Sequence, residues 1–258
     1  PESEWIGISI LAVGCLAFLL LVGAVLVRSI RRRKRPQFSL LWLIAVVMVI
    51  GIGQYGGFRW WAASDARRDW FPDESPAHEV TIGSPFYLGK FEVTQDQYQQ
   101  VMDSNPSAFK GANLPVEDIS WDDAQEFCKK LSQKTGMTVR LPTEAQWEYA
   151  CRAGTRTGFC SGNDEGALDK VAWYSSNSNT KTHPVGEKKA NAWGLYDMHG
   201  NVWEWCRDWY GGYPTGAVQD PEGAAAGTLR VLRGGSWFSY PRLCRSAYRD
   251  CFLLEYRR

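Results

Sequence analysis

GLYDMHGNVWEWCRDWY, residues 194–210, is the most informative stretch of this sequence, and RVLRGGSW follows it at residues 230–237. Glycines and aromatic residues are interleaved here with Asp, Asn and Glu, a mixture that fits neither an amphipathic helix nor a regular strand. Such a mixture suits irregular backbone that is held by aromatic packing and polar hydrogen bonds. We therefore expect a domain with little regular secondary structure around these two segments.

The composition explains how such a domain is stable. The 258 residues include 13 Trp, 11 Tyr and 11 Phe, and each buried aromatic side chain removes about 150–250 Å² of surface from water. The 25 glycines permit sharp turns between the aromatic residues. We expect an aromatic core connected by many loops.

Two long uncharged segments, residues 6–27 and 38–58, precede this domain. Each is long enough to cross a hydrocarbon core of about 30 Å as a helix, and helices of water-soluble proteins rarely stay apolar on all sides over such a length. We expect residues 1–58 to form a transmembrane hairpin in the lipid bilayer.

The loop between the two spans, residues 28–37, carries six basic side chains and no acidic one. Basic loops stay on the cytoplasmic side, which would place the large domain in the periplasm or outside the cell. The formal net charge of the whole chain is +1, so the part outside this loop is acidic and offers no electrostatic footprint for nucleic acid. The sequence thus predicts a multi-pass protein of a bacterial inner or plasma membrane with no nucleic-acid partner.

The folded domain is expected at residues 78–258, after a linker over residues 59–77 in which Pro72 and Pro76 break regular structure. Alternation within residues 78–102 predicts two short strands and then a helix.

Three helix starts are marked by capping residues. Thr94, Ser120 and Thr143 each precede an amphipathic segment, and a hydroxyl at this position accepts a hydrogen bond from the first helical turn. Gly136 predicts the end of the second helix. We interpret these helices as core elements and not as cofactor-binding elements.

Three segments resemble the formylglycine-generating enzyme family, also called sulfatase-modifying factors. They are VRLPTEAQWEYACRAGT from Val139, HPVGEKKANAWGLYDMHGNVWEWCRDWY from His183 and RVLRGGSW from Arg230. The resemblance runs from about His78 to the end, and it implies an α+β fold with little regular secondary structure, distantly similar to C-type lectins. The chain begins without Met and stops at Arg258, before the Gly-Phe-Arg strand with which members usually close, so we expect further residues at both ends.

The resemblance also implies a chemistry, of which this sequence keeps a part. Enzymes of the family hold copper between two cysteines and use oxygen to convert a cysteine of a substrate protein to formylglycine; soft thiolates suit Cu(I). Cys244 stands at the second cysteine position, but Ser239 stands at the first. Ser236 matches an active-site serine, and Trp203 a tryptophan of the oxygen pocket. We expect no copper and no catalysis; Cys244, Ser236 and Trp203 are the catalytic candidates if the chain is an oxidase.

Calcium is the ligand that the resemblance favours. Family members bind it in the segment that matches residues 197–204, which implies the side chains of Asp197 and Glu204 with the carbonyls of Gly200 and Val202. A hard cation prefers such oxygens. The alternative is that both carboxylates only bond to nearby backbone. A second calcium site of the family is not recognisable here.

The cysteines leave several pairings open. Six of the seven follow the predicted spans, in a compartment where disulfides can form. Cys128 and Cys151 match disulfide cysteines of some members, but their partner positions hold Arg249 or lie beyond the chain. A disulfide between Cys206 and Cys244 is a further alternative, because the two family motifs converge.

Two functions from different classes follow. The first is a non-catalytic binding or scaffold domain, an accessory subunit whose partners are other membrane-protein subunits. The second is a membrane-tethered, copper-dependent oxidase that matures sulfatases. The state of Ser239, Cys206 and Cys244 distinguishes them, since an unpaired Cys244 beside a metal favours the enzyme.

Overall fold

The computed structural model of the chain describes residues 72–257. Its helical elements are two 3-10 turns and four α-helices: η1 (Pro72–Glu74), α3 (Gln95–Met102), α4 (Trp121–Thr135), α5 (Glu144–Arg152), α6 (Glu165–Leu168) and η2 (Pro241–Cys244). Its strands are β1 (Val80–Thr81), β2 (Ala172–Trp173), β3 (His199–Gly200), β4 (Glu204–Trp209), β5 (Val218–Gln219), β6 (Leu229–Arg233) and β7 (Asp250–Leu253). Long irregular segments connect them, as expected from the glycine and aromatic content.

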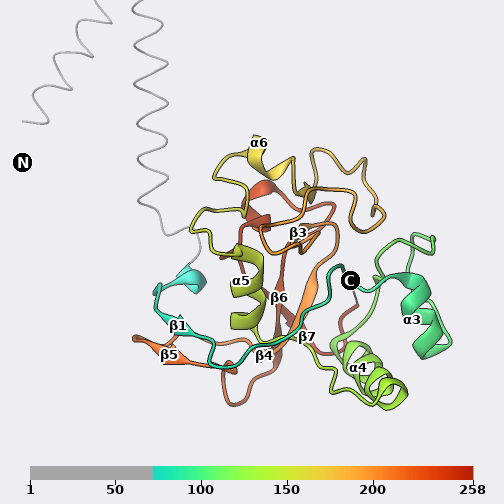
Figure 1. Cartoon of the computed structure of the whole chain (residues 1–258), viewed down its shortest axis with the longest axis horizontal. Coiled ribbons are helices and arrows are strands. Elements are labelled where there is room, and N and C mark those ends of the chain that lie inside the picture. Colours follow the sequence, from blue (N-terminus) through green and yellow to red (C-terminus); the bar gives the residue numbers. More distant parts are fainter. Residues whose placement is uncertain (1–71, 258) are drawn as a thin grey trace, which may run out of the picture. The chain divides into compact units, whose positions relative to one another are not determined.

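The main sheet has three antiparallel strands with β6 at its centre, β4 on one side and β7 on the other. Trp205 pairs with Leu232 and Trp209 with Arg230, and the register shifts between these pairs, so β4 is bulged. Two short parallel pairs, β1 with β5 and β2 with β3, complete the strands. Figure 1 shows β1 and β5 at one edge of the domain and α3 and α4 at the opposite edge.

The three predicted helix starts are confirmed. Thr94, Ser120 and Thr143 each accept a hydrogen bond from the third helical residue, whose side chain reaches back to the cap. This reciprocal capping box satisfies two backbone N–H groups that would otherwise lack partners. The second helix ends at Gly136, which adopts the left-handed conformation with φ 73°.

The prediction of two strands before α3 is wrong in part. Only β1 is present within residues 78–94, followed by an isolated bridge between Thr94 and Pro115. Glycine at positions 83 and 89 and Pro85 interrupt the alternating stretch, and proline cannot donate to a strand ladder.

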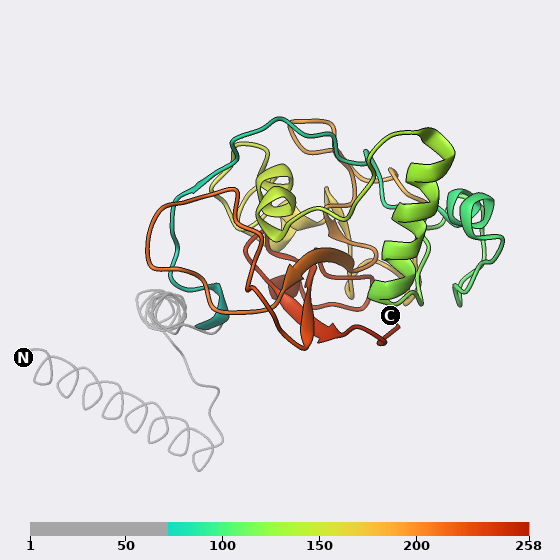
Figure 2. The same cartoon turned by 90° about the horizontal axis from the view of Figure 1, so that it is seen from below.

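The core lies where the helices cover the sheet. Helix α5 packs on β4 and β6, and Trp147 of this helix is completely buried. Helices α3 and α4 pack on each other through stacked rings of Tyr98 and Phe127, whose centroids are 5.4 Å apart. Figure 2 shows α4 lying beside α3.

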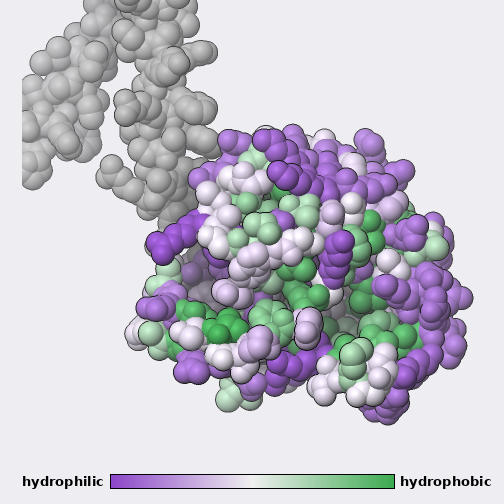
Figure 3. All heavy atoms as spheres, viewed as in Figure 1, coloured by the Kyte–Doolittle hydropathy of each residue, from purple (hydrophilic) through white to green (hydrophobic). Residues whose placement is uncertain are grey.

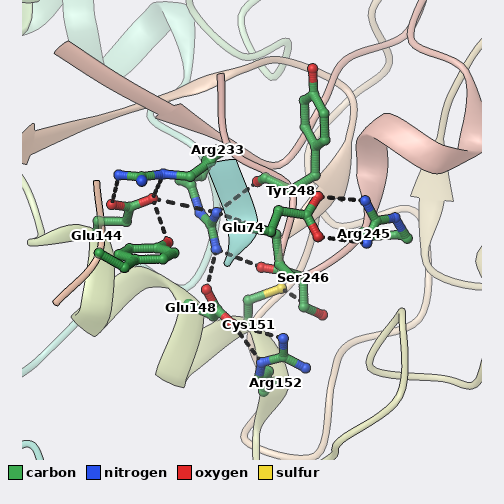
Figure 4. Close-up of polar contacts among 12 residues, drawn as sticks. Glu74, Glu144, Glu148, Cys151, Arg152, Arg233, Arg245, Ser246 and Tyr248 are labelled. Carbon is green, nitrogen blue, oxygen red and sulfur yellow. Dashed lines mark hydrogen bonds and ion pairs between the residues drawn. The ribbon is translucent and has the colours of Figure 1, made fainter. Parts of the chain in front are cut away.

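A buried ion network joins α5 to the C-terminal strands (Figure 4). Arg233 at the end of β6 is 0% exposed, and it forms ion pairs with Glu144 and Glu148 of α5. Its guanidinium also donates to the backbone carbonyls of residues 246–248, at 2.6–2.9 Å. Arg249 clamps the same Glu144 carboxylate with two hydrogen bonds. These charges are therefore paired and hydrogen-bonded, as burial requires.

The start of the described region already belongs to the domain. Glu74, in the stretch assigned to the linker from the sequence, pairs with Arg245 through two hydrogen bonds. Within residues 72–257, no helix has the length and apolar composition that a membrane span needs. The two predicted spans, residues 6–27 and 38–58, and the basic loop 28–37 lie outside the described residues.

Replacing Arg233 should destabilise the domain strongly. Arg233→Met leaves buried carboxylates and carbonyls without their donor, and breaking a buried pair in this way costs about 3–5 kcal/mol. The matched control is Lys129→Met, because Lys129 is 65% exposed where it pairs with Glu126, and such pairs contribute about 0–1 kcal/mol. Urea unfolding of both variants tests this, and a loss below about 1 kcal/mol for Arg233→Met would contradict it.

Candidate functional site

The segment from residue 197 to residue 204 folds into a tight loop before β4. Asp197, Gly200 and Asn201 all have positive φ, at 57°, 81° and 55°. Gly200 is required here, since a Cβ atom on it would lie 2.1 Å from the backbone oxygen of Trp173. The glycine lets β3 approach β2 closely, and the loop turns its polar groups inward.

Asp197 is the most informative side chain of this loop. It is 2% exposed, and its Oδ2 atom accepts a hydrogen bond from the backbone N–H of Gly186 at 2.7 Å. Its Oδ1 atom is buried and has no hydrogen-bond partner among the described residues. Burial raises the pKa of Asp197 to about 6, which the bond from Gly186 partly offsets. A buried carboxylate oxygen without a partner is costly, and a cation would satisfy it.

Glu204, at the other end of the loop, is coupled to Asp197. Burial of its carboxyl raises the pKa of Glu204 to about 7, and the negative charge of Asp197 adds to the rise. The residue as a whole keeps some exposed surface, so it is the carboxyl end that is desolvated. The two side chains named from the sequence therefore lie near each other in a water-poor environment.

Glu92 is a third carboxylate in this region, and the sequence analysis missed it. Its oxygens accept hydrogen bonds from Asn201 Nδ2 at 2.7 Å and from the Val202 backbone N–H at 3.0 Å. Burial, followed by the charges of Asp197 and Glu204, raises the pKa of Glu92 well above its usual range. No sequence motif marks Glu92, because it precedes Asn201 by 109 residues.

The arrangement fits a hard cation if backbone oxygens take part. Within residues 72–257, no group of three or more His, Cys, Asp or Glu side chains is arranged to hold a metal ion alone. The unpartnered oxygen of Asp197 and the carboxyl of Glu204 are two suitable donors, and the carbonyls of Gly200 and Val202 are of the type that calcium accepts.

A cavity of about 500 Å³ opens beside these carboxylates, between α3, α4 and the sheet. Glu92 and Glu204 line it together with mostly apolar side chains, among them Val101, Phe127 and Leu232. In Figure 3 this face of the domain is hollowed, and apolar residues are visible in the hollow.

Ser236, Ser239 and Cys244 come together after β6. The two serine hydroxyls lie 3.0 Å apart, and the Ser239 hydroxyl also accepts from the Ser236 backbone N–H at 3.0 Å. Cys244 is 0% exposed and packs against Gly235, where a Cβ atom would lie 2.6 Å from its sulfur. Burial raises the pKa of Cys244 to about 12, which the Ser236 backbone partly offsets. The thiol is therefore protonated and inert at neutral pH.

His199 joins the same region. Its Nδ1–H donates to the Cys244 carbonyl at 2.7 Å, and its Nε2 accepts from the Cys160 backbone N–H at 3.1 Å. Burial lowers the pKa of His199 to about 4, so the ring is neutral. The sulfur of Cys151 lies 3.6 Å from Nε2, but burial also raises the pKa of this thiol, so the contact is no thiolate–imidazolium pair.

The profile of the family described as "Sulfatase-modifying factor enzyme 1-like domain" matches residues 47–253. The chain belongs to this family.

Relatives of the chain carry different names. Chaperone protein LppX of Paenibacillus barcinonensis is 35% identical, over 66% of this chain and 75% of that protein. Serine/threonine-protein kinase pkn1 of Chlamydia caviae is 33% identical over 69% of this chain, and formylglycine-generating enzyme of Streptomyces coelicolor is 35% identical over 51% of it. The matches span only 32% of the kinase and 45% of the enzyme.

Solved structures agree with the family fold. Treponema denticola variable protein 1 superimposes with a TM-score of 0.64 at 36% identity, covering 66% of this chain and 80% of that chain. PvdO from Pseudomonas aeruginosa has the same TM-score at 30% identity, covering 72% of this chain and 81% of that chain. The chain thus has the formylglycine-generating-enzyme-like fold with few regular elements.

The copper position of the family does not fit copper here. Ser239 offers a hard hydroxyl that is already hydrogen-bonded to Ser236, and Cu(I) prefers soft thiolates.

Trp203, the third catalytic candidate, packs against the cluster of Trp121, Ala124, Trp205 and Leu232. Its ring centroid lies 6.0 Å from that of Tyr248.

The alternative of a disulfide between Cys206 and Cys244 is wrong. All six cysteines of the described region are free thiols. Cys206 packs with Trp147 and Met198, whereas Cys244 packs with Phe159 and Leu168 in a separate core cluster. The family motifs converge, but these two side chains enter different parts of the core.

Thiol labelling in the native state tests this arrangement. We expect iodoacetamide at pH 8 to modify Cys251 and Cys160, which are partly exposed, before Cys206 and Cys244, which are buried. Burial raises the pKa of all four thiols, so the order of labelling follows their exposure. Mass spectrometry of the labelled peptides, with urea-unfolded protein as the control, gives the order. Rapid labelling of native Cys244, or a disulfide-linked peptide containing it, would contradict the structure.

Proposed function

We propose that this chain is a membrane-anchored family member whose domain binds a protein partner and does not oxidise cysteine. The observation that carries the proposal is Ser239, which stands at the first of the two cysteine positions that hold copper in the family's enzymes and whose hydroxyl lies 3.0 Å from that of Ser236. Family membership does not by itself argue for the ancestral activity, because one fold supports many functions. The different names of the relatives support the same view.

The surface beside Ser239 supports a binding role. Phe238 and Tyr240 are 43% and 64% exposed, and Trp237 forms edge-to-face contacts with Phe109 and Phe238. Tyrosine and tryptophan are enriched in protein interfaces because they bury a large area at little cost in side-chain entropy. We propose that this aromatic patch, Trp237, Phe238 and Tyr240, contacts the partner.

The membrane segments supply the second part of the proposal. The uncharged segments at residues 6–27 and 38–58 and the basic loop between them support a hairpin anchor with the domain in the periplasm or outside the cell. A hairpin of two spans presents helix surface to other membrane subunits. We propose that the chain is an accessory subunit of a membrane protein complex, because this role uses both the hairpin anchor and the folded domain.

The second candidate is a membrane-tethered oxidase that converts a protein cysteine to formylglycine. One observation favours it, namely that Cys244 keeps a free thiol at the second cysteine position. It would require Cys244 to ionise and to hold copper with a single thiolate, which its burial opposes.

Purification of the full chain in mild detergent tests the accessory role. We expect a membrane-protein partner to co-purify, to be lost when residues 1–58 are replaced by an unrelated anchor, and to bind at least about tenfold more weakly to a Phe238→Ser/Tyr240→Ser variant, since interface aromatics often contribute about 2 kcal/mol. Met137→Ser is the matched surface control, because Met137 is also 64% exposed.

A different result would support the oxidase. The same preparation, given copper, oxygen and a cysteine peptide, should form no aldehyde above the level of a Cys244→Ser variant. A monomer without a partner that forms formylglycine and loses this activity in Cys244→Ser would contradict the binding proposal.

We also propose a calcium ion at Asp197 and Glu204, with the carbonyls of Gly200 and Val202 as further ligands. The unpartnered buried oxygen of Asp197 supports it, as does the closeness of the two carboxyls to each other. When bound, calcium would neutralise these charges and fix the loop between them.

Calcium should therefore stabilise the chain. At a concentration of 100 times the dissociation constant it adds about 2.7 kcal/mol, so the melting temperature should rise. The Asp197→Asn/Glu204→Gln variant should not respond, whereas Asp96→Asn/Glu165→Gln, which changes exposed carboxylates, should respond like the wild type. Equal melting temperatures of the wild type with calcium and with chelator would contradict the site.

A further inference from the structure

We infer that Glu92 is the positioning residue of the proposed calcium site. This inference rests on the calcium proposal and extends it to a residue outside the 197–204 loop. Glu92 is 8% exposed and comes from the extended segment just before α3, far from the loop in sequence.

Glu92 holds the centre of the loop and does not itself reach an ion. Its two carboxylate oxygens are already used, one by Asn201 Nδ2 and the other by the Val202 N–H. The described residues also contain no cluster of three acidic side chains arranged as direct metal ligands. Its effect on a cation must therefore act through the loop.

The peptide bond between Asn201 and Val202 is fixed on both sides. Its N–H donates to Glu92 Oε1 at 3.0 Å, and its carbonyl accepts from the Trp237 N–H at 2.8 Å. This peptide lies between the two carbonyls proposed as ligands, those of Gly200 and Val202. Fixing it restricts how both can turn, and partners that orient metal ligands in this way are typically worth 10–100-fold in affinity.

The contacts of Glu92 give a second reason. Within the described residues no ion pair joins Glu92 to a basic side chain, whereas the buried Glu144 pairs directly with Arg233 and Arg249. The carboxyl of Glu92 therefore serves the loop alone, and Asp197 of the same loop presents a buried oxygen that has no hydrogen-bond partner among these residues. A divalent cation would satisfy that oxygen.

Calcium titration of the full chain in detergent, by calorimetry and by melting in chelator, tests the inference. We expect Glu92→Gln to bind calcium about 10–100-fold more weakly than the wild type, because an amide has one acceptor oxygen and can hold only one of the two loop donors. The donor left without a partner should also lower the melting temperature in chelator, but by less than in calcium, where the weaker binding adds to the loss. Glu117→Gln is the matched control, since Glu117 also accepts a backbone hydrogen bond, from Phe109 at 2.8 Å, but lies outside the site; its calcium affinity should not change.

A purely structural role of Glu92 gives a different result. If Glu92 stabilised the fold without orienting the calcium ligands, Glu92→Gln would lose as much stability in chelator as in calcium and would keep its affinity, and this would overturn the inference. Wild-type binding with unchanged affinity in Glu92→Gln overturns the role of Glu92 alone, whereas a wild type that binds no calcium overturns the calcium site as well. If Glu92→Gln does not fold, Glu92→Asp decides, because displacing the carboxylate should weaken binding and wild-type affinity would overturn the inference.

Discussion

The buried side chain of Asn201 connects segments that lie far apart in the sequence. It is 0% exposed and donates to Glu92 and to the His183 carbonyl, while its own carbonyl oxygen accepts from the His183 N–H. Its backbone bonds to Trp173 on one side and Trp237 on the other. In a domain with few strands, such a fully satisfied polar group fixes the position of four chain segments. Both candidate sites, the carboxylates and the serine pair, depend on this connection.

The sequence predicted local features well because they depend on neighbouring residues. The caps at Thr94, Ser120 and Thr143 need only the next three residues, and all three helices start where expected. The two short strands were only partly right, because an alternating pattern does not by itself supply a partner strand. The family resemblance drew attention to the loop from Asp197 to Glu204, and the carboxyl groups at both of its ends are desolvated.

Long-range contacts were beyond the sequence. Glu92 and Asn201 are 109 residues apart, and Arg233 reaches Glu148 across 85 residues; neither pair follows a spacing that one sequence reveals. His199 is an instructive case, since it contacts Cys151 and Cys244 but is kept neutral by burial. The sequence shows that this residue is a histidine, which can be charged or neutral. Only its surroundings in the fold determine its protonation state.

The loop around Asp197 and the segment around Ser239 belong to one scaffold but differ in chemistry. At Ser239 one of the two soft ligands of the enzymes is replaced by a hydroxyl beside exposed aromatic side chains, which favours contact with a partner. Around Asp197 the hard oxygen donors are kept and lie close to Glu92. We propose that calcium supports the shape of a surface whose task is binding.

A crystal structure of the chain equilibrated with calcium and Cu(I) together, with anomalous difference maps at the copper edge, tests this account most directly. The account predicts an ion about 2.3–2.6 Å from Asp197 Oδ1 and the Glu204 carboxylate, and no copper peak near Cys244. Copper bound to the Cys244 sulfur, with no ion at Asp197, would contradict it.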